Sequence, residues 1–95
     1  GRAYMPVAYK EAQARMRKQI KEQWDQGPIT GPVNLSITVR GEGRGDLDNI
    51  AGAFLDVAQG IIIMDDRVGF VPQLAIRWEK AKKEDSEWII EIRCL

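Results

Sequence analysis

The stretch VNLSITVRGEGRGDLDNIAGAFLD, residues 33–56, places a strand pattern, a glycine-rich loop and a helix pattern in direct succession. Residues 33–40 alternate apolar and polar side chains, which predicts a strand with one buried face. Residues 46–58 carry apolar side chains at helical spacing, and an aspartate at the start of this segment is a suitable N-cap. The loop GEGRG (41–45) has three glycines that permit positive φ or close approach of a ligand.

The flanking segments extend this pattern in both directions. Apolar side chains recur every four positions over residues 7–25, which predicts an amphipathic helix that GPITGP ends. IIIMDD (61–66) is either a brief buried strand or an extended turn. PQLAIRWEK (72–80) and EWIIEIRC (87–94) alternate as strands do, and the polar residues 80–86 between them are typical of a hairpin loop.

This order of elements predicts an α+β fold, because the strands must pair and the helices need an apolar sheet face to cover. We expect a two-layer sandwich in which two helices cover one face of a small mixed or antiparallel sheet, within one domain of residues 1–95. The side chains expected to point inward from the last two strands are Leu74, Ile76, Trp78, Trp88, Ile90, Ile92 and Cys94.

Composition removes several classes of site. The 95 residues include one cysteine, Cys94, and no histidine, so the chain has no intrachain disulfide and no His-based catalysis or metal site. Any metal must be held mainly by oxygen atoms, which favours hard cations. The start of the chain lacks a signal-peptide pattern, and no apolar run approaches the roughly 18 residues of a membrane span. We therefore expect a cytoplasmic protein with no membrane partner.

Charge is distributed unevenly although the net charge is zero. Residues 1–21 hold six basic side chains and one acidic one, whereas residues 41–66 hold six acidic side chains and one basic one. This asymmetry suits a polyanionic substrate handled through metal ions, but an ordinary solvated helix and acidic loop explain it equally.

Four acids form the strongest candidate constellation. Asp46 and Asp48 lie at a helix start, and Asp65 and Asp66 follow an apolar run. If the run packs beside the helix start, the carboxylates converge and would hold Mg²⁺ or Mn²⁺ for phosphodiester hydrolysis. The structural alternative is that the first pair caps the helix and the second pair forms a turn.

The stretch GDLDNIAGAFLDVAQGIIIMDDRVGF resembles the signature of the RusA-type endonucleases, which are phage and bacterial Holliday junction resolvases. The shared pattern is D-x-D-N, an Asp eight residues after the second Asp, a Gly, and D-D after a short apolar run. The upstream GRAYMPVAYKEAQARMRKQI is also similar to the family's approach to its first helix. The matching residues here are Asp46, Asp48, Asn49, Asp56, Gly60, Asp65 and Asp66.

The resemblance implies a homodimeric nuclease, dependent on Mg²⁺ or Mn²⁺, that cuts four-way DNA junctions by paired nicks in a bacterial or phage-infected cell. It assigns catalysis and metal binding to Asp46, Asp48 and Asp66, with Asp65 as a weaker metal ligand and with Asn49 and Asp56 in support. The basic residues expected to contact DNA are Lys10, Arg15, Arg17, Lys18, Lys21 and Arg44.

Two departures from the family pattern leave other functions open. Gly52 stands where family members usually carry a lysine, a role that Lys10 is a candidate to fill. The family usually begins with a strand and a basic, proline-rich loop before GRAY, and this chain starts at GRAY, so we expect that strand to be missing. The alternatives are a junction-binding homologue that has lost catalysis, and a small metal-binding or oligomerising domain.

Overall fold

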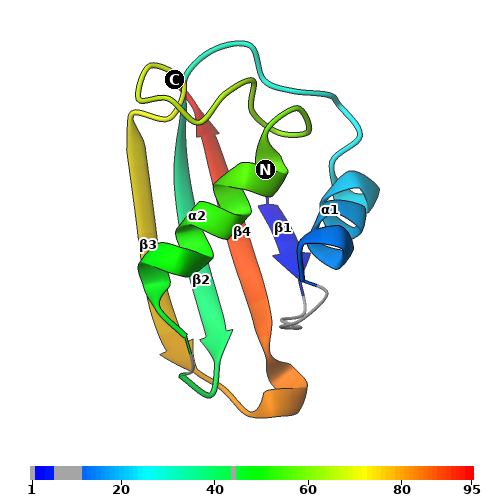
Figure 1. The fold of residues 1–95 in the computed structure, drawn as a ribbon, viewed down its shortest axis with the longest axis vertical. Helices are drawn as coiled ribbons and strands as arrows, with labels where there is room; N and C mark the ends of the chain where they lie inside the picture. Colours follow the sequence, from blue (N-terminus) through cyan, green and yellow to red (C-terminus); the bar gives the residue numbers. More distant parts are fainter. Residues whose placement is uncertain (1, 6–11, 44) are drawn as a thin grey trace.

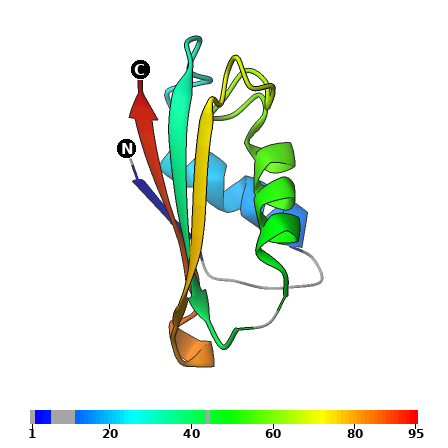
Figure 2. The ribbon, with the colours of Figure 1, turned by 90° about the vertical axis from the view of Figure 1, so that its left-hand side faces the viewer.

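A computed structural model describes residues 2–5, 12–43 and 45–95 of the chain. Within these described residues, two helices, α1 (Ala12–Gln23) and α2 (Leu47–Ala58), accompany one four-stranded sheet in the order β1-β4-β2-β3. The strands are β1 (Arg2–Met5), β2 (Val33–Gly41), β3 (Gln73–Lys80) and β4 (Glu87–Cys94) (Figure 1). Both helices lie on the same side of the sheet (Figure 2), so the predicted two-layer α+β fold is confirmed.

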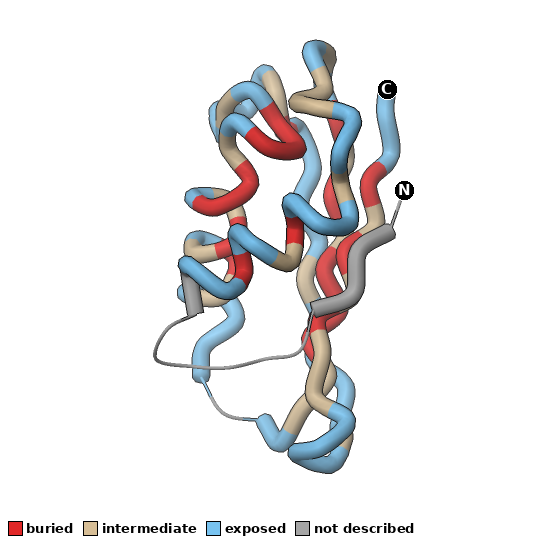
Figure 3. The backbone as a smooth tube through the Cα atoms, turned by 90° about the vertical axis from the view of Figure 1, so that its right-hand side faces the viewer, coloured by how far each residue is buried: buried red, intermediate tan, exposed pale blue. Residues whose placement is uncertain are grey.

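β2 is the central element of the sheet. It pairs in parallel with β3 and antiparallel with β4, so that Ile37 lies between Ile76 and Ile90. Its apolar side chains point toward the helices and are buried, and buried segments line the space between the two layers (Figure 3). The core cluster adds Met16 and Ile20 from α1 to Phe54, Val57 and Ala58 from α2. The alternation in the sequence thus sets which face of the sheet is covered.

The predicted hairpin between the last two strands is wrong. β3 and β4 are not neighbours, because β2 lies between them. Their connection passes the end of β2, where the Ala81 N–H donates to the Gly41 carbonyl over 2.9 Å, and it includes the short 3₁₀ helix η1 (Lys83–Asp85). A polar loop between two alternating segments predicts a turn of the chain, but it does not determine which strands pair.

The N-terminal segment also differs from the sequence prediction. Arg2–Met5 forms β1, which pairs antiparallel with the outer side of β4, whereas no strand was expected before the first helix. A strand of four residues is too short for alternation to distinguish it from irregular chain. The first helix begins at Ala12 among the described residues and ends at Gln23, two residues earlier than predicted. Residues 7–11 of the predicted helix lie outside the described residues.

IIIMDD adopts the extended-turn alternative. Ile61, Ile62 and Ile63 are buried, yet they form only isolated bridges, from Ile63 to Ile29 and to Gln59. Gly60 follows the helix with φ of 81°, and its N–H donates to the Ile63 carbonyl. The apolar run therefore closes the end of α2 as a compact turn.

Burial along the last two strands differs from the expected pattern at three residues. Trp88 is buried as predicted, but Leu74 and Trp78 are 36% and 44% exposed, and Cys94 is exposed. β3 is an edge strand, so side chains on its apolar face have cover from one side only. Edge position, which local alternation does not encode, explains the error at Leu74 and Trp78.

Candidate metal and DNA-binding site

The first acid pair lies where α2 begins. Asp46 is the N-cap, with extended φ and ψ of −104° and 136°, and its carbonyl accepts the Ile50 N–H. Its side chain makes no capping hydrogen bond; one carboxylate oxygen instead lies 3.5 Å from the amide nitrogen of Asn49. Asp48 follows in the first turn, where the helix dipole favours negative charge. All three side chains are exposed and accessible to a cation or a phosphate.

The glycine-rich loop before α2 is packed against a tryptophan. The Trp78 indole N–H donates to the Gly41 carbonyl over 3.2 Å. Gly43 has φ of 94°, and a Cβ at that position would lie 3.0 Å from the Trp78 ring. Glycine is therefore favoured at this position for two independent reasons, the positive φ and the close approach of the Trp78 ring.

The second acid pair lies beyond the other end of α2. One Asp65 oxygen accepts the Arg67 backbone N–H over 3.0 Å, and the other accepts its Nε–H over 2.9 Å. Arg67 in turn lies 6.0 Å from the centre of the Phe70 ring. Both Asp65 oxygens are therefore engaged by Arg67, whereas the neighbouring Asp66 is exposed. This arrangement leaves the Asp66 carboxylate more accessible than that of Asp65.

The pKa of Asp65 lies below its ordinary value of 3.8, chiefly because the Arg67 backbone N–H donates a hydrogen bond to the carboxylate. The positive charge of the Arg67 guanidinium lowers this pKa further. Because its pKa is lower in the folded than in the unfolded state, Asp65 stabilises the folded protein at pH values above the unfolded-state pKa. This stabilisation is lost as the pH falls through the folded-state pKa. An NMR titration that follows the Asp65 carboxyl carbon would measure this pKa. Arg67→Ala should raise the pKa of Asp65 only in part, because the backbone donor remains.

The two acid pairs do not meet within one chain. Asp46 follows the C-terminal end of β2, whereas residues 64–72 lead into the start of β3, which pairs with the N-terminal end of β2. Helix α2, whose 12 residues span about 18 Å, lies between the two pairs in the chain. Accordingly, the described residues contain no group of three or more acidic or cysteine side chains able to hold one metal ion. The apolar run packs at the end of the helix and not at its start.

The expected supporting and DNA-binding residues are partly described. Asp56 is exposed on α2, and the basic residues Arg15, Arg17, Lys18 and Lys21 are exposed on α1. Three of these, Arg17, Lys18 and Lys21, line one open depression with Ala14 and Glu22. Lys10 and Arg44 lie outside the described residues.

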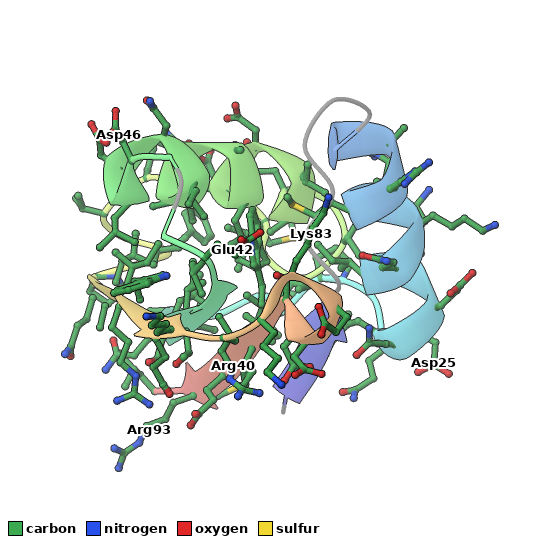
Figure 4. The ribbon with its side chains drawn as sticks, turned by 90° about the horizontal axis from the view of Figure 1, so that it is seen from below. Asp25, Arg40, Glu42, Asp46, Lys83 and Arg93 are labelled. Carbon is green, nitrogen blue, oxygen red and sulfur yellow. The ribbon has the colours of Figure 1, made fainter. Side chains whose placement is uncertain are left out.

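Sequence reasoning overlooked a second group of basic residues. Lys80 and Lys82 line a depression with Glu42 and Ala81 at the C-terminal ends of β2 and β3, and exposed Lys83 follows them. Figure 4, which looks onto this end of the molecule, shows Glu42 and Lys83 near the middle of the view and Asp46 at the start of α2. The signal in the sequence is the run KAKKEDS (80–86), which has three lysines, although its polar character by itself indicates only a loop.

Gly52 lies on the exposed side of α2. A Cβ at this position would have no neighbouring atom within 4 Å outside the helix backbone, and φ is not in the left-handed region. Neither packing nor backbone conformation requires a glycine here.

Gly52→Ala should therefore raise the free energy of unfolding by about 0.5–1 kcal/mol, because alanine restricts the unfolded chain and favours the helix. Urea titration followed by circular dichroism would measure the change. Gly60→Ala is the matched control: it should destabilise the protein, because its φ is positive. A loss of stability in Gly52→Ala would contradict the assignment of Gly52 to an open helix surface.

These features define a small α+β domain that presents exposed carboxylates at both ends of one helix and basic side chains on α1 and on the loop after β3. The chain belongs to the endodeoxyribonuclease RusA family, whose model matches residues 1–93. No curated protein and no solved structure matches the chain. Membership supports an endonuclease activity of the Holliday junction resolvase type. Among the described residues, neither helix has the length and apolar character needed to cross a bilayer.

Proposed function

We propose that residues 1–95 form one nuclease domain that resolves four-way DNA junctions by paired nicks, using Mg²⁺ or Mn²⁺, in the cytoplasm of a bacterial or phage-infected cell. The observation that carries the proposal is the family match over residues 1–93, together with the acids that the family pattern requires at both ends of α2. Four-way junctions are two-fold symmetric, which suits cleavage by a symmetric dimer.

The donor set fits a hard divalent cation. Asp46, Asp48 and Asp66 present exposed carboxylates, and oxygen is the ligand that Mg²⁺ and Mn²⁺ prefer. Asp46 and Asp48 would hold the ion at the start of α2, with Asn49 steadying Asp46 and with Asp66 completing the set. A cation bound there would polarise the phosphate and supply hydroxide for hydrolysis. The helix N-terminus would add positive potential toward the scissile phosphate.

The separation of the acid pairs favours a homodimer. A two-fold axis beside α2 reverses the direction of the second copy, so the start of α2 in one copy faces the end of α2 in the other. Asp46 and Asp48 of one chain would then share a site with Asp66 of its partner, and each dimer would have two such sites. This arrangement also explains why a single chain gathers only two of these acids at one end.

DNA would lie across the end of the sheet that carries Asp46. The lysines at positions 80, 82 and 83 are on this end, and the basic side of α1 provides a second contact surface. Contacts of this kind are made with phosphates and release counterions, so binding should weaken as salt increases.

Lys82→Ala combined with Lys83→Ala should weaken junction binding several-fold and reduce the salt slope by about 1–2, because each lost phosphate contact removes nearly one released counterion. Binding would be measured by fluorescence anisotropy over a range of NaCl concentrations. Lys18→Ala combined with Lys21→Ala tests α1 in the same way. An unchanged salt slope in the first variant would exclude the loop after β3 from the DNA interface.

The direct test of function is cleavage of a synthetic four-way junction with Mg²⁺, with Mn²⁺ and with EDTA, next to a linear duplex of the same sequence. We expect symmetric paired nicks in the junction with either metal, no cleavage in EDTA, and little cleavage of the duplex. Cleavage that continues in EDTA would exclude the proposed metal chemistry.

A junction-binding homologue without catalysis is the second candidate, and the exposed Gly52 favours it. The position can accept a side chain without a clash, so Gly52→Lys tests the alternative cleanly. Under this candidate the wild type binds junctions without nicking them, and Gly52→Lys gains cleavage. Efficient cleavage by the wild type would eliminate it.

A further inference from the structure

The outer edge of β3 is a pairing surface. β3 is the last strand of the sheet, and its outward backbone groups have no strand partner among the described residues. Natural proteins usually protect such an edge, because it is a template for another strand. Here eight residues run without a bulge or an internal proline, and Leu74 and Trp78 are exposed on the helix-facing side. The edge therefore combines unpaired backbone with exposed apolar side chains.

The sequence of β3 is self-complementary in one antiparallel register. With Ile76 opposite its own copy, Leu74 lies opposite Trp78 of the second copy, so the two exposed apolar side chains meet on the helix-facing side. On the other side Arg77 lies opposite Ala75, and Glu79 lies opposite Gln73. No two like charges are directly opposed in this register.

The neighbouring registers are less favourable. A shift in one direction places Arg77 directly opposite Arg77 of the second copy, which is repulsive. A shift in the other direction places Trp78 opposite Pro72, which lies before the strand, and shortens the ladder. A one-residue slip would put the helices of the two copies on opposite faces of the joined sheet.

We propose that β3 pairs antiparallel with β3 of a second copy of this chain, with Ile76 on the two-fold axis, to form a continuous eight-stranded sheet. The backbone ladder provides most of the contacts, and the two Leu74–Trp78 contacts exclude water on the side of the helices. Trp78 also holds the glycine loop before α2, so the interface and the start of α2 share a residue.

This inference rests on the homodimer of the proposed function and names the surface that forms it. Antiparallel pairing places the start of β3 in one copy beside the end of β3 in the other. The segment that carries Asp65 and Asp66 leads into the start of β3, and Asp46 lies at the end where β3 finishes. The β3 interface therefore brings the two acid pairs to the same end of the joined sheet from different chains.

Sedimentation equilibrium of the full chain, without DNA or metal, tests the interface. Leu74→Glu and Trp78→Lys should each weaken dimerisation about tenfold or more, because each places two charges against apolar partners. The double variant should regain much of the affinity, because each Glu then faces a Lys across the two-fold axis. Leu95→Glu, an equally drastic change at an exposed residue, is the control and should leave dimerisation unchanged.

The outcomes separate the interface from the function. A wild type that stays monomeric at high micromolar concentration, or a dimer that is insensitive to both single variants, would overturn the β3 interface. Failure of the double variant to recover while circular dichroism shows it folded would overturn the register. A β3 dimer that never cuts junctions would sustain this inference and refute the proposed function.

Discussion

Asp48→Asn and Asp66→Asn should each reduce junction cleavage by about two orders of magnitude or more, because each removes a charged ligand from the proposed metal site. Cleavage would be measured as single-turnover nicking of a four-way junction with Mg²⁺. Both variants should still bind the junction, since neither removes a basic residue. Asp25→Asn, at an exposed acid after α1, is the control and should retain full activity. Undiminished cleavage by both variants would place the catalytic centre elsewhere.

The two inactive chains should complement each other when mixed. In a heterodimer of Asp48→Asn with Asp66→Asn, one shared site carries both changes and the other carries neither. A one-to-one mixture that re-equilibrates at random should therefore regain about a quarter of the wild-type sites, each making one nick. A site contained within a single chain would show no recovery. Recovery of single nicks without paired resolution would thus show that the site is shared between two chains.

Phe54→Ala should lower the free energy of unfolding by about 3–5 kcal/mol, because it leaves a large cavity in the centre of the core. Phe54 is fully buried between α2 and the sheet, next to Val57 and Ala58 in the core cluster. A domain of this size is stable by only about 5–15 kcal/mol, so this loss is a large fraction of the total stability.

Urea unfolding monitored by tryptophan fluorescence would measure the loss. Leu95→Ala, at a residue that is 66% exposed, should change stability by less than about 0.5 kcal/mol. A loss below about 1 kcal/mol in Phe54→Ala would mean that α2 does not pack on the sheet as described.

The sequence predicted most of the local elements, and it supplied the candidate site residues, which stay a prediction. β2 and α2 were recognisable from alternation and helical spacing, since both patterns depend on residues close together in the chain. The four aspartates were recognisable for the same reason, as were the basic residues of α1. The lysines after β3 could have been found by asking which charged runs follow neighbouring strands, but that question requires the strand order.

The tertiary structure alone decided how these elements are arranged. It placed β2 between β3 and β4, made β3 an edge strand with Leu74 and Trp78 exposed, and added β1 outside β4. It also separated Asp46 from Asp66 by the length of α2. Periodicity specifies which face of each element is buried, whereas strand order and the distance between remote residues depend on long-range packing. For this chain, the sequence identifies the acids, and the fold determines that one chain alone does not bring them together.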